Sequence, residues 1–174
     1  TQLYQTLTFE NQNQNTEFVL DLNSELEDLV ITTDPTRLKQ IITNLASNAL
    51  KFTKRGWVKI TAKHEYYALL RNKGFVFKSP LPVEEEILFF CVEDTGLGID
   101  EKNLDIIFEP FRKVEQDNRE LYGGVGLGLS IVKKLVLLLG GEIQVKSALN
   151  QGSAFYFYLP MQIPTDEVKV KTKK

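Results

Sequence analysis

The chain has 174 residues, of which 43% are hydrophobic and 25% are charged, so it is long enough to bury one sizeable core. Its formal net charge of −2 gives no broad electrostatic reason to expect nucleic acid or an anionic membrane as a partner. The single cysteine, Cys91, excludes an internal disulfide and a cysteine-rich metal site, and no apolar run reaches the length of a membrane span. We therefore expect one cytoplasmic domain that contacts neither nucleic acid nor a membrane directly.

The first part of the chain predicts two short strands and a long amphipathic helix. Residues 16–33 contain alternating apolar residues and then the apolar run 29–31, and these predict the two strands. Asp34-Pro35 is typical of a helix start, with a side-chain acceptor at the N-cap and proline at the first helical position. Apolar residues at helical spacing then continue to about Lys54, and Gly56 ends the helix.

The rest of the chain mixes strands and helices without a steady β-α-β rhythm. Its patterns predict, in chain order, a strand at 57–62, an irregular stretch at 64–86 with a hairpin around Gly74, a buried strand at 87–93, a short helix at 99–108, a mobile charged segment at 109–124, a largely buried helix at 127–139, and two strands at 142–147 and 153–159 joined by a turn. This order favours the α+β class: a two-layer sandwich with helices on one face of a mixed sheet.

Two glycine-rich segments, 92–99 and 123–130, indicate a nucleotide pocket. Glycines leave backbone N–H groups uncovered, and the apolar run after the second segment would place a helix N-terminus beneath a phosphate. Neither segment fits a common phosphate motif. Leu129 stands where the Walker pattern needs lysine, and the third glycine of the dinucleotide pattern arrives one residue early, at Gly128.

A polar stripe runs along the first predicted helix. Arg37, Asn44, Asn48 and Lys51 fall in one narrow sector beside the apolar face. Asparagine is unfavourable inside a helix, so the two asparagines either cap local backbone and face water or serve a site. Together with the glycine segments they suit a Mg²⁺-nucleotide site, because Mg²⁺ prefers oxygen ligands and commonly takes one or two from the protein.

Four segments resemble, in the same order, the N, G1, F and G2 boxes of sensor histidine kinases. They are residues 34–53, 93–99, 107–111 and 124–129. The resemblance covers roughly residues 17–160 and implies the Bergerat fold, which gyrase, the MutL repair protein and the ninety-kilodalton heat-shock chaperone share. In that fold ATP binds between the helices and a flexible lid. The implied organisation is a linker remnant from dimerisation helices at 1–15, a catalytic ATP-binding domain at 16–160, and a tail at 161–174.

The resemblance also implies roles for single residues. Asn48 matches the Mg²⁺ ligand, with Asn44 one turn earlier, and Lys51 would reach the phosphates. Asp94 matches the carboxylate that accepts the adenine amino proton, although an Asx-turn is the alternative role for Asp before Thr-Gly. The other implied nucleotide contacts are Phe52, Gly96, Gly98 and Ile99 near the base, Phe108 and Phe111 as an aromatic lid hinge, and Gly124, Val125, Gly126, Leu127, Gly128 and Leu129 around the phosphates. Phe52 has a core role as its alternative.

Catalysis is implied for Asn44, Lys51 and Lys113, where Lys113 matches a basic residue that faces the terminal phosphate and Arg112 competes for that role. Two departures from related proteins matter. Val125 replaces a threonine often found in the G2 loop. Asn44 stands where related ATPases have a glutamate that activates water, and an amide cannot act as a general base. We therefore expect slow hydrolysis and transfer of the γ-phosphoryl group to another acceptor.

The expected acceptor is a histidine on a helical dimerisation domain. The single histidine, His64, follows a predicted strand and lacks a helical phosphoacceptor motif, so we expect a surface residue at a strand end. Because the chain starts at Thr1, it is expected to be a fragment of a longer parent, which can itself be membrane-anchored. The implied partners are the dimerisation domain of the same parent and the receiver domain of a response regulator. Two alternatives stay open: a non-catalytic nucleotide-binding regulatory module, and a gyrase- or chaperone-type ATPase.

Overall fold

The computed structural model describes residues 15–23, 26, 29, 31–78, 81–82, 84–111 and 126–161. Its elements in chain order are β1 (Thr16–Leu22), α2 (Pro35–Phe52), β2 (Gly56–Tyr66), α3 (Tyr67–Asn72), β3 (Glu86–Asp94), the 3₁₀ turn η2 (Glu101–Asn103), α4 (Gly128–Leu138), β4 (Glu142–Ser147) and β5 (Ser153–Pro160). Within the described residues these strands form one five-stranded sheet in the order β1-β2-β3-β5-β4. β1 pairs with β2 in parallel, and the other three pairs are antiparallel, so the sheet is mixed.

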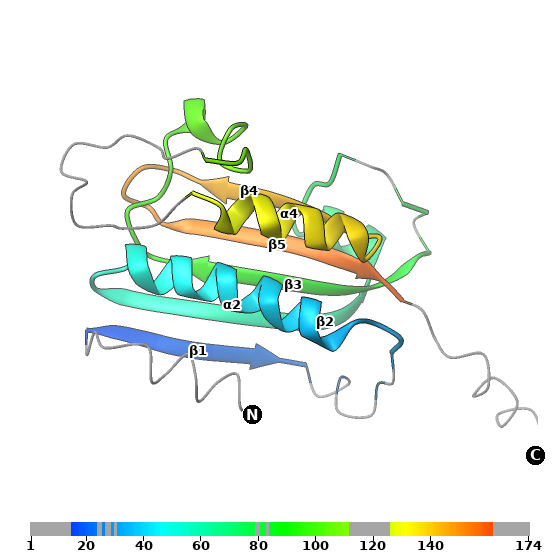
Figure 1. Cartoon of the computed structure of the whole chain (residues 1–174). Coiled ribbons are helices and arrows are strands. Elements are labelled where there is room, and N and C mark those ends of the chain that lie inside the picture. The colour runs from blue at the N-terminus through cyan, green and yellow to red at the C-terminus, as the bar shows by residue number, and fades with distance from the viewer. Residues whose placement is uncertain are drawn as a thin grey trace, which may run out of the picture.

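The helices α2 and α4 pack against each other and together cover one face of the sheet (Figure 1). Their buried residues, such as Ile41 and Val132, meet Val58, Val92 and Phe157 from the three central strands. Burial of these apolar side chains is the main stabilising contribution to the fold. The predicted α+β sandwich with the long helices on one face is therefore confirmed.

The helix α2 begins where the sequence predicts. The Asp34 carboxylate accepts hydrogen bonds from the backbone N–H groups of Thr36 and Arg37, at 3.0 and 3.1 Å, and Pro35 is the first helical residue. These bonds satisfy donors that a helix start would otherwise leave unpaired. The helix ends at Phe52, because Thr53 leaves the helical conformation as its C-cap, two residues before the predicted end.

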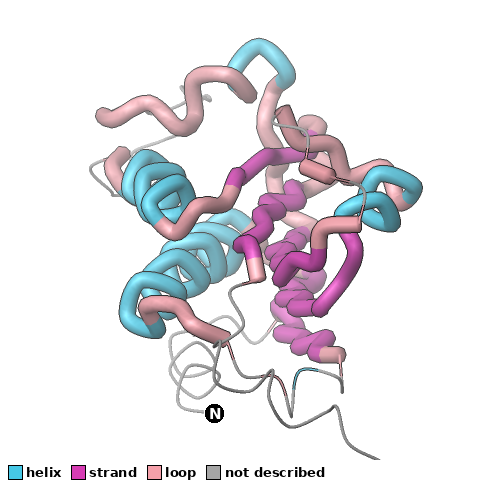
Figure 2. Tube along the Cα trace, turned by 90° about the vertical axis from the view of Figure 1, so that its right-hand side faces the viewer, coloured by secondary structure: helices cyan, strands magenta, loops and turns pink. Residues whose placement is uncertain are grey.

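The opposite face of the sheet carries an aromatic cluster that the sequence analysis missed. Tyr67 and Phe77 pack on Phe89, Tyr156 and Tyr158, and Phe77 meets Tyr158 edge-on with ring centres 4.7 Å apart. These contacts place α3 on the side of the strands away from the long helices (Figure 2). The irregular stretch predicted from residue 64 is therefore wrong at its start, since β2 continues to Tyr66 and a helix follows.

The predicted hairpin around Gly74 is also wrong. Gly74 lies in a turn just after α3, with φ of 79°, and the chain around it leads from a helix to irregular structure instead of joining two strands. Glycine adopts this left-handed conformation without steric cost, which explains why a glycine occupies this turn position. The sequence correctly predicted a turn at Gly74, but the two strands predicted on either side of it are wrong.

Three further predictions need correction. Leu29 and Ile31 belong to no strand and instead pack as irregular chain against the core, so the second predicted strand is absent among the described residues. The helix predicted at 99–108 is reduced to η2 followed by turns. The predicted burial of α4 on most of its surface is wrong, because only one face meets the sheet and Leu137 and Leu138 are 55% and 63% exposed.

Several predictions fall outside the described residues. They are the linker remnant before Asn15, the charged segment after Phe111 up to residue 125, and the tail after Met161. Within the described ranges, none of the helices combines the length and the hydrophobicity that a membrane span requires.

Candidate nucleotide-binding site

Four predicted site residues, Asn48, Phe52, Gly96 and Gly128, lie where α2 ends and α4 begins. Figure 1 shows these two helix ends at the same side of the helix layer. Asn48 lies beside the start of α4, because a Cβ placed at Gly128 would lie 3.8 Å from its Nδ2 atom. At the end of α2 the carbonyl oxygen of Phe52 accepts the N–H of Leu97, at 3.3 Å. The structure thus brings the C-terminal part of the polar stripe, the first glycine segment and the start of α4 together. Arg37 lies in the first turn of α2 and pairs instead with Asp34, with its Nε atom 2.9 Å from Oδ2.

The stripe residues Asn44, Asn48 and Lys51 are each partly exposed, so their side chains are accessible to a ligand. Phe52 is 38% exposed, with the Nζ atom of Lys51 5.2 Å from its ring centre. The core role considered for Phe52 is therefore excluded, and its ring lies at the surface beside the stripe.

Asp94 ends β3 and is 8% exposed. Its Oδ1 atom accepts the N–H of Gly96 at 2.8 Å, which is the local turn bond named above as the alternative role. Burial raises the pKa of the Asp94 carboxyl, while hydrogen bonds from the N–H groups of Gly96 and Ser153 and from the Thr53 hydroxyl act in the opposite direction. A buried carboxyl held by several donors is well placed to present a fixed acceptor to a ligand.

The glycines of the 96–98 loop are required by packing. A Cβ at Gly96 would clash with the carbonyl oxygen of Phe52, and one at Gly98 would clash with the carbonyl oxygen of Ala148. Gly98 also has φ of 65°, in the left-handed region. The loop is therefore wedged between the end of α2 and the turn between β4 and β5.

The second glycine segment is described from Gly126 onward. Gly126 has φ of 75°, and Leu127 at the N-cap of α4 supplies no side-chain hydrogen bond to the helix start. Backbone N–H groups at such a start are well suited to binding a phosphate. Gly128 and Leu129 form the first residues of α4.

The two ends of the predicted lid meet in the structure. The N–H of Phe111 donates to the carbonyl oxygen of Gly126, at 3.1 Å. Phe111 has φ of 62° and is 71% exposed, whereas Phe108 packs edge-on against Phe155 with ring centres 6.2 Å apart. The two predicted hinge aromatics therefore differ: one is anchored in the core, and the other is exposed in a strained backbone conformation. Lys113, Arg112, Gly124 and Val125 lie outside the described residues.

His64 lies far from this site. It pairs with Leu88 inside β2, not at its end, and its Nε2 atom is 3.0 Å from the Glu86 carboxylate. Asp94 follows Leu88 by six residues in the same strand, which corresponds to about 20 Å at roughly 3.3 Å per residue. Cys91 is a buried member of the aromatic cluster on the opposite face of the sheet, and burial raises its pKa to about 12, so it is no nucleophile.

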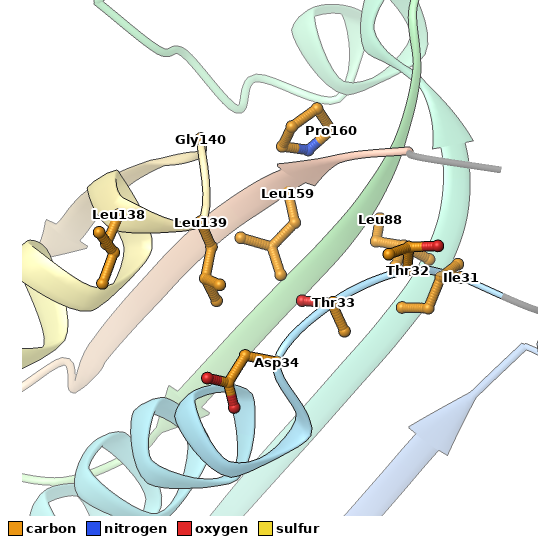
Figure 3. A pocket seen from close by; sticks show the side chains of 10 residues that line it. All are labelled: Ile31, Thr32, Thr33, Asp34, Leu88, Leu138, Leu139, Gly140, Leu159 and Pro160. Atoms are coloured by element: carbon orange, nitrogen blue, oxygen red, sulfur yellow. The ribbon is translucent and has the colours of Figure 1, made fainter. Parts of the chain in front are cut away.

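A pocket of about 400 Å³ lies at the other end of the helix layer, where α2 begins and α4 ends (Figure 3). Its lining includes Thr33, Asp34, Leu139 and Leu159, and it contains none of the predicted site residues. Among the described residues no group of three His, Cys, Asp or Glu side chains could hold a metal. An amide oxygen that shares Mg²⁺ with phosphate oxygens and water needs no such group.

Two site residues were missed by the sequence analysis. Thr53 is buried beside Asp94 and lowers the pKa of its carboxyl, and Ser147 accepts the N–H of Ile99 at 2.8 Å. The signal that could have found Ser147 is its place opposite Ser153 in the predicted hairpin of β4 and β5, next to the strand that ends in Asp94.

Comparison with known proteins gives a consistent result. The model of the family described as histidine kinase-, DNA gyrase B-, and HSP90-like ATPase matches residues 33–163. The autoinducer 2 sensor kinase/phosphatase LuxQ of Vibrio vulnificus is 45% identical over 135 residues, covering 78% of this chain and 14% of LuxQ. The signal transduction histidine-protein kinase BarA of Escherichia coli is 36% identical over 157 residues, covering 90% of this chain and 16% of BarA.

Solved structures agree with these relatives. The crystal structure of full-length ShkA in complex with AMPPNP matches with a TM-score of 0.71 and 31% identity, covering 94% of this chain and 29% of ShkA. The catalytic domain of histidine kinase ThkA matches with a TM-score of 0.67 and 28% identity, covering 92% of this chain and 88% of that domain. The chain thus corresponds to a single catalytic domain, and it spans only 14% to 16% of the length of LuxQ and BarA.

Proposed function

Because this chain belongs to the family of histidine kinase-, DNA gyrase B- and HSP90-like ATPases, and matches the catalytic domains of sensor histidine kinases, we propose that it binds Mg²⁺-ATP and transfers the γ-phosphoryl group to a histidine on a separate dimerisation domain. The observation that carries this proposal is the meeting of the Asn48 side chain, the start of α4 and the loop after Asp94 at one end of the helix layer. AMPPNP in the ShkA crystal supports an adenine nucleotide as the ligand.

The roles at the site follow from the chemistry of each group. Asp94 accepts a hydrogen bond from the adenine amino group, which a guanine carbonyl could not donate. The N–H groups at the start of α4 bind phosphate, and Lys51 adds a flexible positive charge. Asn48 holds Mg²⁺ through its amide oxygen, and the metal supplies neutralisation of the phosphate charge. Lys113 or Arg112 faces the terminal phosphate.

The transfer itself needs positioning more than covalent participation by this chain. A nitrogen of the acceptor imidazole forms a bond to the γ-phosphorus while the bond from that phosphorus to the β,γ-bridging oxygen breaks. ADP leaves with the electron pair of that bond, and the imidazole loses its N–H proton to solvent. Asn44 cannot take a proton from water, so hydrolysis stays slow and the phosphoryl group is kept for the histidine. The same feature disfavours a gyrase- or chaperone-type ATPase.

The partners of the proposed activity lie outside this chain. The acceptor is a dimerisation domain of the same parent, and a receiver domain of a response regulator takes the phosphoryl group afterwards. One of the relatives is a hybrid signal transduction histidine kinase of Dictyostelium discoideum, which supports a parent that combines several domains. We propose a cytoplasmic location for the domain, because the proposed reaction uses ATP.

Binding of nucleotide is the first test. We expect AMPPNP with Mg²⁺ to raise the melting temperature, because a ligand at one hundred times its Kd adds about 2.7 kcal/mol to the free energy of unfolding. Titration calorimetry should give weaker binding when EDTA removes the metal. An unchanged melting temperature at saturating AMPPNP and Mg²⁺ would contradict the proposed function.

A further inference from the structure

The loop at 96–99 and the turn between β4 and β5 are locked together. The N–H of Asn150 donates to the carbonyl oxygen of Leu97 at 2.7 Å. A Cβ at Gly152 would clash with the carbonyl oxygen of Asp94, just as one at Gly98 would clash with that of Ala148. The loop after Asp94 therefore packs directly against the turn between β4 and β5.

One side chain hydrogen-bonds to both the β4–β5 turn and the 96–99 loop. Ser147 is the last residue of β4, and its Oγ atom accepts the N–H of Ile99 at 2.8 Å. The same hydroxyl donates to the carbonyl oxygen of Gly152 at 2.8 Å and lies 2.9 Å from the Oγ atom of Ser153. A hydroxyl has one donor and two acceptor positions, so with Ser153 as the donor of the third bond all of them are filled.

The network continues to the carboxylate that the proposed function assigns to the base. Ser147 pairs with Ser153 across β4 and β5, and Ser153 pairs with Asp94 across β5 and β3. The backbone N–H of Ser153 acts to lower the pKa of the Asp94 carboxyl beside it. Ser147 thus bonds directly to the loop at Ile99 and to Ser153, the residue that pairs with Asp94 in the sheet.

We propose that Ser147 is a positioning residue for nucleotide binding: its hydroxyl fixes the 96–99 loop and Ser153 around Asp94, and this sets the affinity for the adenine base. The proposal rests on the proposed function, since it needs an adenine nucleotide at Asp94. Ser147 acts through Ile99, Gly152 and Ser153.

The test compares Ser147→Ala with the parent chain in AMPPNP titrations with Mg²⁺. Loss of the hydroxyl leaves the Ile99 N–H and the Gly152 carbonyl without this partner, and we expect affinity to fall by about 5- to 10-fold, the scale of one lost hydrogen bond. Ser147→Thr keeps the hydroxyl and should restore most of the affinity. Amide hydrogen exchange at Ile99 should become faster in Ser147→Ala and return toward the parent rate in Ser147→Thr.

Two controls separate positioning from general destabilisation. Tyr156→Phe removes a hydroxyl that donates to the carbonyl oxygen of Val76 at 3.1 Å on the opposite face, and it should leave affinity and Ile99 exchange unchanged. The second is a double-mutant cycle with Asp94→Asn. If both residues act on the base, the fold loss of AMPPNP affinity caused by Ser147→Ala should be less than half as large in the Asp94→Asn background as in the parent chain.

Each outcome has a defined meaning. Three results would overturn the role of Ser147 while leaving the proposed function intact. They are parent-like affinity in Ser147→Ala, a full additive loss in the double-mutant cycle, and failure of Ser147→Thr to restore binding. A parent chain that binds no nucleotide would overturn the proposed function and this role with it. Should Ser147→Ala not fold, Ser147→Cys replaces it, because a thiol is a weak hydrogen-bonding group of similar shape and the same loss is expected.

Discussion

At the scale of single residues, Asp94 meets two opposing requirements. Burial raises its pKa and so penalises the ionised form, yet an ionised carboxylate is the better acceptor for an amino group. The N–H of Gly96 fixes the carboxyl in place at 2.8 Å, and together with the neighbouring Ser153 and Thr53 it lowers the pKa and offsets part of that penalty. The sequence predicted Asp94 from its motif, but Thr53 is placed by the end of α2, and Ser147 by the register of β4 on β5, which the predicted hairpin could have indicated.

Asp94→Asn tests the base contact. The new NH₂ group can face the adenine amino group donor to donor, and the mismatch in a buried site costs roughly 1 to 3 kcal/mol. We expect AMPPNP affinity to fall by about one to two orders of magnitude in calorimetry. Parent-like affinity would return Asp94 to a purely turn-capping role, which its bond to Gly96 already provides.

The two asparagines of α2 allow a matched comparison. Asn48 lies beside the start of α4, whereas Asn44 is one turn earlier on the same helix face. Asn48→Ala should therefore abolish most of the difference in affinity between titrations with Mg²⁺ and with EDTA, while Asn44→Ala retains that difference. If Asn48→Ala retains the full metal dependence, the metal ligand is another residue.

At the scale of elements, local signals predicted α2 well and α3 not at all. Asp34, Pro35 and the apolar spacing that follows each act within a few residues, so the sequence alone marks the start of α2. The helix α3 is short, and its register is set by packing of Tyr67 and Leu70 on the sheet, which is a tertiary effect. For α4, an apolar composition could not indicate which side faces the core.

Substitutions in α4 test this one-sided burial. Val136 is fully buried, and Val136→Ala should lower the free energy of unfolding by about 2 kcal/mol through lost burial and a cavity. Leu137 is its neighbour and is 55% exposed, so Leu137→Ala should change stability by no more than about 0.5 kcal/mol. Denaturant titration of both variants is the measurement. Equal losses would show that α4 is buried on both sides in solution.

At the scale of the whole molecule, the sheet holds the site and the single histidine apart. His64 pairs with Leu88, six residues before Asp94 in β3, so no rearrangement within one rigid sheet brings it to the phosphates. Four ordered motifs predicted the family, and the order of helices and strands predicted the mixed sheet; both are confirmed. The acceptor histidine on a separate domain stays a proposal, because this chain spans only 14% of LuxQ and 16% of BarA.

Phosphoryl transfer between separate domains tests the central claim most directly. The chain is incubated with Mg²⁺ and ATP labelled in the γ-phosphate, either alone or mixed with the dimerisation domain of its parent. We expect no label on this chain alone, and slow labelling of the dimerisation domain at its histidine, because the covalent link that raises effective concentration is missing. The product should be acid-labile and base-stable, as a phosphoramidate is. An unlabelled dimerisation domain, acid-stable label, or label on this chain that His64→Gln removes would contradict the account.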